Sequence, residues 1–241
     1  MINKLDQVGA VVTTDYRTAS VFRKHGIDFC CGGGKTIEKA CQSKDANMSL
    51  LLDELNALSG ETDTNESRYT EWPLTQLVDY IVDHHHVYTK RTLLELDQYL
   101  SKVEKVHGEH NPELKKIYHL FSLMAEELTV HMYKEESILF PYIQTLDEYW
   151  SKGQPAPKPG FGTIQYPIQM MEQEHEQAGD CMSEIRSLTN DYSPPSHACN
   201  TYRVSFKLLE EFEKDLHMHV HLENNILFPR AIQLEKESNQ L

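Results

Sequence analysis

The sequence of 241 residues lacks any apolar run close to the ~20 residues that a membrane-spanning helix requires. Its first stretch, MINKLDQVGAVVTTDY, also lacks the charged-then-apolar pattern of a signal peptide, so we expect a cytoplasmic protein without membrane contact. Basic residues are scarce, because 23 Lys and Arg stand against 37 Asp and Glu, and the formal net charge is −14. Such a charge disfavours binding to a nucleic acid.

Cysteine is scarce too, and its five residues are an odd number. In a reducing compartment we expect them to be thiols rather than a disulfide framework. The sequence also has no alternating Val- or Ile-rich strand pattern, no nucleophile motif of a Ser/His/Asp hydrolase and no phosphate-binding glycine loop after a strand. The residue type in excess is histidine, which occurs 13 times.

Helical periodicity organises the chain. Residues 1–58 predict a small helical domain, with a short helix over 15–24 that stops at Gly26, a helical piece from Thr36 and another over 48–58. The polar, acidic segment 59–71 predicts a linker. Residues 72–241 predict four long helices, at 73–107, 112–149, 166–188 and 197–235. We therefore predict an all-α fold: an up-and-down four-helix bundle preceded by a small helical N-terminal domain.

Two stretches of the predicted bundle repeat one pattern, HMYKEESILFP from residue 131 and HVHLENNILFP from residue 219. Both read His-x-x-x-Glu-x-[Ser/Asn]-Ile-Leu-Phe-Pro. Apolar residues spaced alternately three and four apart predict the buried seam of each bundle helix, and Ile138 belongs to it. In the second, third and fourth helices this seam also includes polar residues: His131, Glu135, His175, His219 and Glu223.

The first long helix contains the run His84-His85-His86. Its seam includes His86, but His85 lies almost as close to the apolar face, so periodicity disfavours His84 and leaves the other two open. His86 and His131 are 45 residues apart, and His175 and His219 are 44 apart. Each half of the bundle would thus supply a histidine from one helix and His-x-x-x-Glu from the next.

Burying so many polar groups in one core is costly unless they are paired or bind metal. Two metal ions bridged by Glu135 and Glu223, with two histidines each, would use all six groups. Mixed imidazole and carboxylate ligation fits iron or manganese and permits zinc. A ferritin-like site is the weaker alternative, because it needs two Glu-x-x-His motifs and only Glu172 with His175 fits.

The stretch GIDFCCGGGKTIEKAC places Cys30 and Cys31 before three glycines and a helix start, with Lys35 nearby. Backbone N–H groups and a cation predict lowered thiol pKa values. The functional interpretation is a redox-active or metal-handling pair, and the alternative is two buried small residues beside a flexible turn. The other cysteines predict packing roles: Cys41, Cys181 and Cys199.

This combination resembles the di-iron proteins for repair of iron–sulfur clusters, which join a small cysteine-pair domain to a hemerythrin-like bundle. The resemblance covers nearly the whole chain and rests on VGAVVTTDYRTASVFRKHGIDFCCGGGKTIEKAC, HMYKEESILFP, EHEQAG and HLENNILFPRA. It implies His86 rather than His85 as a ligand. The sequence departs from the family in its triple histidine and in His217 and His221, which leaves replacement by a neighbouring histidine or a peripheral metal open. The implied iron ligands are His86, His131, Glu135, His175, His219 and Glu223.

The resemblance implies repair of iron–sulfur clusters damaged by nitric oxide or peroxide. Our hypothesis is an oxo-bridged non-haem di-iron centre, with Cys30 and Cys31 accepting iron or nitrosyl species or passing electrons. The expected partners are damaged iron–sulfur proteins, nitric oxide or oxygen as a small ligand, and an electron donor that the sequence does not identify. The alternatives are an oxygen- or nitric-oxide-binding sensor or carrier, and a nitric oxide reductase. The linker leaves docking within one chain or across a homodimer open.

Overall fold

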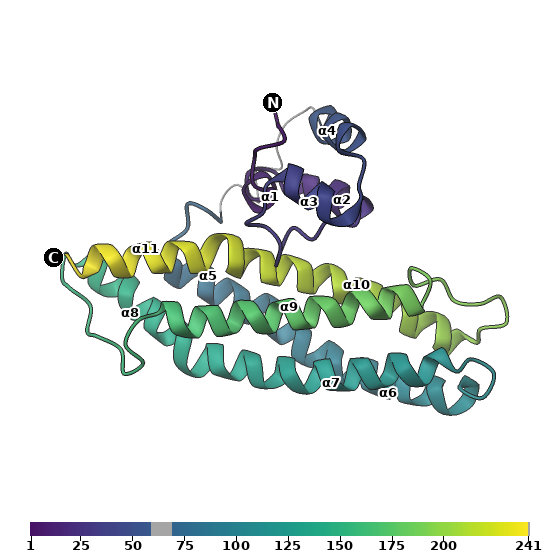
Figure 1. The fold of residues 1–241 in the computed structure, drawn as a ribbon. Helices are drawn as coiled ribbons and strands as arrows, with labels where there is room; N and C mark the ends of the chain where they lie inside the picture. The colour runs from purple at the N-terminus through teal and green to yellow at the C-terminus, as the bar shows by residue number, and fades with distance from the viewer. Residues whose placement is uncertain (59–68, 241) are drawn as a thin grey trace. The chain divides into compact units, whose positions relative to one another are not determined.

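The computed structural model describes residues 1–58 and 69–240 (Figure 1). These residues form helices and no strands, apart from an isolated bridge between Gln7 and Thr36, which confirms the predicted all-α class. Most of the predicted linker, 59–71, lies outside the described residues, and 69–71 form a turn. Within the described part of the chain, no helix is both long and apolar enough to cross a membrane.

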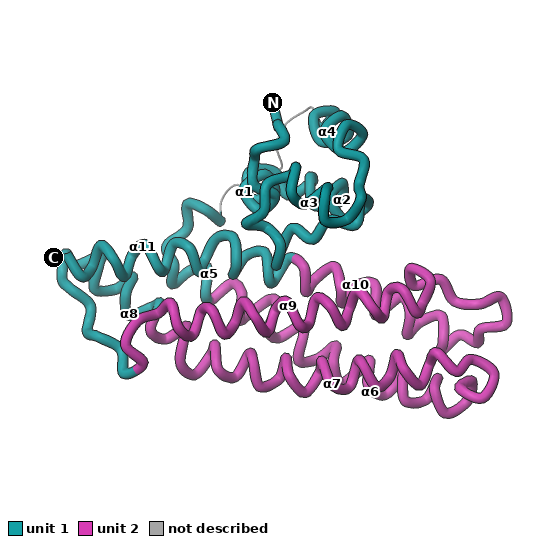
Figure 2. The backbone as a smooth tube through the Cα atoms, in the orientation of Figure 1, with its two compact units in different colours: residues 1–78, 143–160, 218–241 teal, residues 79–142, 161–217 magenta. Residues whose placement is uncertain are grey.

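The chain divides into two compact units, which Figure 2 colours separately. Unit 1 comprises residues 1–78, 143–160 and 218–241, and unit 2 comprises residues 79–142 and 161–217. Each unit is described by itself. The predicted division into domains 1–58 and 72–241 stays a prediction.

Unit 2 is a helical bundle. The π-helical turn η1 (Ile81–His86) continues into α6 (Val87–His107), and α7 (Glu113–Lys134) continues into the π-helical turn η2 (Glu135–Leu139). The other members are α9 (Gln165–Leu188) and the first part of α10 (Asn200–Leu222). In Figure 2 these magenta segments run side by side, as the sequence predicted.

Side-chain pairs join each helix of unit 2 to the next around the bundle. Tyr118 of α7 donates a hydrogen bond of 3.0 Å to Asp97 of α6, and Lys116 of α7 pairs with Glu184 of α9. Helix α10 contacts both of its neighbours in the same way. Arg186 Nε of α9 lies 3.1 Å from Glu213 Oε2 of α10, and His85 Nδ1 of η1 lies 3.1 Å from Asp215 Oδ1 of α10. The cyclic order is therefore α6, α7, α9, α10.

The buried seam follows the predicted register along most of the bundle. Ile138 is the exception, because its side chain is 49% exposed and the next residue, Leu139, is buried instead. A π-helical turn holds one more residue per turn than an α-helix, so it rotates the following side chains around the helix axis. The predicted burial of Ile138 is therefore wrong. The confirmed core residues of α7 and α9 are Leu114, Ile117, Phe121, Met124, Leu128, Ile168, Met171, Ala178, Met182 and Ile185.

Both copies of the repeated motif contain a π-helical turn: η2 in unit 2 and η3 (Glu223–Leu227) in unit 1. Pro141 and Pro229 follow these turns as the second residues of α8 (Phe140–Ser151) and α11 (Phe228–Ser238). Because proline has no N–H, neither residue can bond the carbonyl four positions earlier, and the regular α-helical ladder is interrupted there. Each turn begins at a predicted iron ligand, Glu135 or Glu223.

Unit 1 contains the N-terminal helices α1 (Val8–Thr14), α2 (Arg17–Lys24), α3 (Ile37–Lys44) and α4 (Met48–Ala57), and also most of α5 (Leu74–Tyr80). The structure confirms the short helices predicted from residue 15 to 58. Gly26 ends α2 with a φ of 68°, and Thr36 caps α3 by accepting a hydrogen bond from the Lys39 N–H. Helix α1 was not predicted, although Val8, Val11 and Val12 are buried at helical spacing.

Candidate metal centre and cysteine loop

Buried polar side chains from four elements of unit 2 face one another. His131 Nε2 of α7 lies 2.9 Å from His175 Nε2 of α9 and 3.2 Å from Glu135 Oε2 of η2. His86 Nε2 of η1 lies 3.4 Å from the same Glu135 oxygen. All four side chains are almost completely buried. The ligand atoms of His131, Glu135 and His175 lie within 4.8 Å of one another, which is the separation expected around one metal ion.

A carboxylate of unit 2 orients the imidazole of His86. Oε1 of Glu136 lies 2.6 Å from His86 Nδ1 and also accepts a hydrogen bond of 2.6 Å from Lys90. Although burial opposes it, hydrogen bonding to Lys90 and His86 lowers the pKa of Glu136 below its usual range. An ionised Glu136 can only accept, so His86 Nδ1 carries a proton and donates it, and the other ring nitrogen, Nε2, faces Glu135.

The same arrangement holds His131. Oε2 of Glu174 lies 2.9 Å from His131 Nδ1, and Lys134 pairs with the other oxygen of this carboxylate. The hydrogen bond from His131 lowers the pKa of Glu174, and the bond from Lys134 adds to it against the effect of burial. With Nδ1 bound to Glu174, the other nitrogen of His131, Nε2, faces Glu135 and is the atom that the neutral ring can offer to a metal ion. Carboxylates that accept from the outer nitrogen of a histidine are the usual support of metal-binding imidazoles.

Unit 1 carries the second His-x-x-x-Glu pair. His219 Nε2 lies 2.9 Å from Glu223 Oε1, one helical turn apart where α10 passes into η3, and both side chains are buried. The donors of the two units, imidazole nitrogen and carboxylate oxygen, are the ligand types that suit iron in a protein. By donor type, burial and support, the residues fit an iron site.

A turn in unit 1 presents the cysteine pair. The carboxylate of Asp28 accepts backbone hydrogen bonds from Cys30 at 2.9 Å, from Cys31 at 3.0 Å and from Gly32 at 3.0 Å. Cys30 Sγ lies 3.2 Å from Asp28 Oδ1 and 3.9 Å from Cys31 Sγ. Asp28 was not predicted as part of this site, although an Asp two residues before the pair is a known stabiliser of such turns.

This geometry overturns the expectation of lowered thiol pKa values for Cys30. The hydrogen bond to Cys31 raises the pKa of the Cys30 thiol well above its usual range, and burial and the Asp28 carboxylate raise it further. The backbone N–H groups that were expected to stabilise a thiolate bond the carboxylate of Asp28 instead. Lys35 is exposed and is not among the groups that change this pKa.

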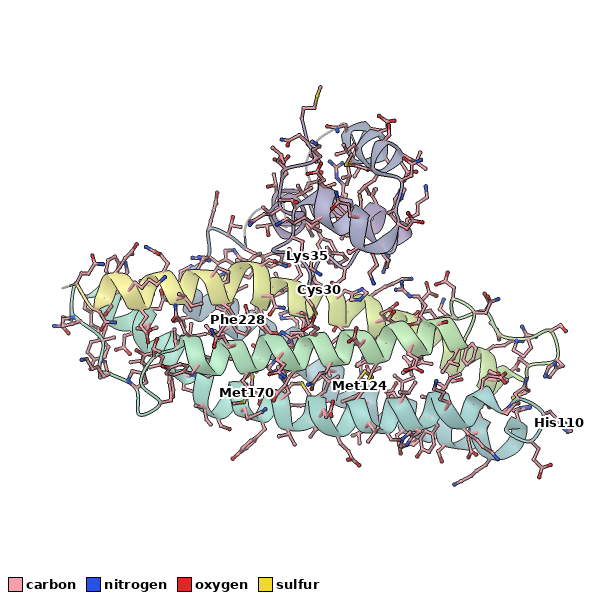
Figure 3. All side chains as sticks on the ribbon, viewed as in Figure 1. Cys30, Lys35, His110, Met124, Met170 and Phe228 are labelled. Atoms are coloured by element: carbon pink, nitrogen blue, oxygen red, sulfur yellow. The ribbon has the colours of Figure 1, made fainter. Side chains whose placement is uncertain are left out.

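The loop between α2 and α3, residues 25–36, is the cysteine loop. Within unit 1 the π-helical turn η3 contacts this loop, and Figure 3 shows Cys30 close to this part of the chain. Asn224 Nδ2 donates to the Cys30 carbonyl at 3.3 Å, and Asn225 Nδ2 donates to the Phe29 carbonyl at 3.2 Å. The Asn225 carboxamide fits between two glycines, because an added Cβ would lie 2.3 Å from its Oδ1 at Gly9 and 2.5 Å at Gly33. The residues that directly follow Glu223 therefore anchor the cysteine loop.

Of the extra histidines, His221 lies buried against the rings of Tyr16 and Phe29, with centroid separations of 5.7 and 6.1 Å. Its Nδ1 lies 3.0 Å from Asn225 Nδ2, so the amide donates and the imidazole accepts. Burial lowers the pKa of His221 to about 4, which keeps the ring neutral. His221 therefore packs the cysteine loop onto α10 within unit 1.

Two families match the chain. The Hemerythrin HHE cation binding domain matches residues 77–231, and the Domain of Unknown function (DUF542) matches residues 4–59. The iron-sulfur cluster repair protein YtfE of Yersinia pestis strain Pestoides F is 38% identical over 229 residues, which cover 95% of this chain and 97% of that protein. YtfE of Yersinia pseudotuberculosis serotype O:1b shows the same identity and coverage. The chain belongs to the YtfE family.

The structure of this YtfE-family chain distributes the predicted ligands over both units. His86, His131, Glu135 and His175 face one another in unit 2, while His219 and Glu223 form their own pair in unit 1. Ligation by these six residues stays a prediction. In unit 2 His86 faces Glu135, whereas His85 bonds Asp215 and the exposed His84 stacks on Tyr80 with a centroid separation of 4.2 Å.

Sequence reasoning missed the supporting carboxylates of the YtfE-family site, although both stand beside predicted ligands in the sequence: Glu136 follows Glu135, and Glu174 precedes His175. Of the remaining cysteines, Cys41 is buried as predicted. Cys199 is exposed beside His107, at a distance of 3.2 Å from Nε2, so its predicted packing role is wrong.

Proposed function

We propose that this protein restores iron–sulfur clusters damaged by nitrosative or oxidative stress, by supplying iron, handling nitric oxide, or both. Membership of the YtfE family supports this proposal, since the relatives carry the name iron-sulfur cluster repair protein. The single observation that carries it is the buried group of unit 2, in which two imidazoles supported by carboxylates present Nε2 to one glutamate.

In this proposal six residues hold two iron ions in a non-haem centre: His86, His131, Glu135, His175, His219 and Glu223. Bound iron would supply redox chemistry and a position for a small ligand. Glu136 and Glu174 keep the protons of His86 and His131 on Nδ1, so that Nε2 stays available for the metal. The almost complete burial of Glu135 excludes water, which strengthens its attraction for a cation.

Cys30 and Cys31 would accept iron or nitrosyl species, or pass electrons. The hydrogen bond from Asn224 to the Cys30 carbonyl supports this role, because it ties the cysteine loop to the residue next to Glu223. A simple oxygen or nitric oxide carrier has no evident use for such a loop, and this favours repair over the carrier alternative.

The first experiment measures metal content per chain and the electronic spectrum of anaerobically purified protein. We expect two irons per chain, and a loss of iron in His131→Ala and Glu223→Ala. His119→Ala is the matched control, because this exposed histidine lies on the same helix as His131. Absence of metal, or a single zinc ion that survives both substitutions, would contradict the iron centre.

The second experiment measures recovery of a nitric-oxide-damaged iron–sulfur enzyme after addition of the iron-loaded protein. We expect Cys30→Ser/Cys31→Ser to abolish recovery, while Cys199→Ser at the exposed thiol leaves it unchanged. Full recovery with the double variant would remove the cysteine pair from the mechanism. Reversible oxygen binding without any recovery would favour the carrier, and turnover of nitric oxide with an electron donor would favour the reductase.

A further inference from the structure

One carboxylate and two thiols, all side chains of types that bind metal ions, lie close together in the cysteine loop. The ligand atoms of Asp28, Cys30 and Cys31 lie within 4.8 Å of one another. The two sulfurs are 3.9 Å apart, and Cys30 Sγ is 3.2 Å from Asp28 Oδ1. A tetrahedral centre with metal–sulfur bonds of about 2.3 Å separates its sulfurs by about 3.8 Å. The thiols therefore already stand at the spacing of two ligands of one tetrahedral ion.

The backbone of this loop is fixed before any metal binds. Three successive N–H groups, from Cys30 to Gly32, donate to the Asp28 carboxylate. The carbonyls of Phe29 and Cys30 accept from the carboxamides of Asn225 and Asn224. A site whose ligands are held in position avoids much of the ordering cost of binding.

The three donors also leave one side open. Cys30 is 4% exposed, whereas Cys31 is half-buried and Asp28 is exposed. A metal bound by these residues would have protein ligands on its inner side and a solvent-facing fourth position, as sites that exchange a ligand require. This differs from the buried imidazole and carboxylate donors of unit 2.

We propose that Asp28, Cys30 and Cys31 form a second metal site that takes Fe²⁺ in transit through two thiolates and one carboxylate oxygen. The proposal rests on the repair function, because iron supply makes Fe²⁺ the cargo. Binding releases the two thiol protons as the divalent cation enters, so the net charge of the loop does not change. Thiolates are softer ligands than the imidazoles and carboxylates of the bundle, and this suits a site that passes iron toward a thiolate-bound cluster.

Asp28 is the residue to test, because its carboxylate has two roles to separate: ligand of the metal ion, or only acceptor of the backbone hydrogen bonds that shape the turn. The test titrates the full-length, reduced protein with Co²⁺, whose thiolate charge-transfer bands report the number of bound sulfurs. The titration of Cys30→Ser/Cys31→Ser is subtracted, which removes any Co²⁺ bound elsewhere in the chain. We expect Asp28→Asn, which keeps an oxygen acceptor but loses the charge, to weaken Co²⁺ binding at least about tenfold.

Asp6→Asn is the matched control, because the Asp6 carboxylate also accepts a backbone hydrogen bond, from Asn3 at 2.8 Å, away from the cysteine pair. Its Co²⁺ affinity should equal that of the unchanged protein. Asp28→Cys provides a second measurement: a ligand position would recruit the new thiolate, and the charge-transfer intensity should rise from two thiolates to three.

An unchanged Co²⁺ affinity in Asp28→Asn, or an intensity that stays at two thiolates in Asp28→Cys, would overturn the assignment of Asp28. Absence of thiolate bands in the unchanged protein would overturn the whole site. The outcome is separate from the repair assay, because the Co²⁺ bands of the cysteine loop depend neither on iron in the bundle nor on recovery of a damaged enzyme.

Discussion

The Asn225 carboxamide lies between Gly9 and Gly33, and we predict that it keeps the cysteine loop closed. Asn225→Ala removes the donor to the Phe29 carbonyl at 3.2 Å and to the Cys30 carbonyl at 3.5 Å. A hydrogen bond within a protein contributes about 0.5–1.5 kcal/mol net, so losing two should favour local opening of the loop by about 1–3 kcal/mol. Since about 1.4 kcal/mol is a factor of ten, Cys30 should become accessible roughly 5 to 150 times more often.

The measurement is the alkylation rate of Cys30 in the metal-free, reduced protein, followed by mass spectrometry under native conditions. Cys30 is 4% exposed, so its alkylation reports opening of the loop. The half-buried Cys31 serves as an internal comparison, and Asn56→Ala is the control. Asn56 also donates to a backbone carbonyl, that of Ile2 at 3.0 Å, but it does so away from the cysteine loop.

A double-mutant cycle with Gly9→Ala tests whether Asn225 is the element that matters. The added Cβ would lie 2.3 Å from Asn225 Oδ1, so Gly9→Ala should displace the carboxamide and speed alkylation by itself. In Asn225→Ala the clashing atom is absent, and the second substitution should have a much smaller effect. Effects that add within about 0.5 kcal/mol would refute the direct contact, because independent sites are additive to that extent. An unchanged Cys30 rate in Asn225→Ala would refute the anchoring altogether.

Three further predictions concern the bundle. Glu174→Gln should weaken iron binding about 10- to 100-fold by removing the carboxylate that orients His131, and competition with a chelator measures this loss. Arg186→Met should destabilise the fold by about 3–5 kcal/mol in urea unfolding, because it leaves the buried carboxylate of Glu213 without its cation; a cost under about 1 kcal/mol would mean that solvent screens the pair. Burial raises the pKa of Tyr202 to about 12, so the unfolded chain loses this proton first, and the stabilisation should fall as the pH rises from about 10 through 12. Tyr202→Phe should flatten that part of the stability profile, and an unaltered profile would show that the hydroxyl ionises equally in both states.

Much of the fold could be predicted because it depends on local pattern. The helix bounds of the bundle and most of its seam follow from apolar spacing alone, and that spacing also brought His131, Glu135 and His175 to the buried face. Ile138 shows where the pattern stops working: it assumes a constant rotation per residue, and η2 breaks that assumption after Glu135. The proline at the end of the motif predicts that the α-helical hydrogen-bond pattern is interrupted, but it does not predict at which residues the wider π-helical turn forms.

The supporting partners could not be predicted, because they depend on how neighbouring helices are rotated about their axes. Glu136 reaches His86 across 50 residues of sequence, and Glu174 reaches His131 across 43. A periodic pattern marks a buried face, whereas these carboxylates stand at the edge of it, half exposed. The choice between His85 and His86 has the same origin, since the position of Asp215 on α10 gives the His85 imidazole a hydrogen-bond partner.

The two copies of the repeated motif differ at the position after the glutamate, and the difference has a structural reason. In η2 this residue is Glu136, which accepts from the Nδ1 of His86 and so orients an imidazole. In η3 it is Asn224, which donates to the Cys30 carbonyl. A glutamate there could not donate, because a carboxylate only accepts, and the Cys30 carbonyl would then face another acceptor. The two copies of the motif therefore differ in sequence at the position where their tasks differ. The copy in η2 supports a histidine, and the copy in η3 holds the cysteine loop.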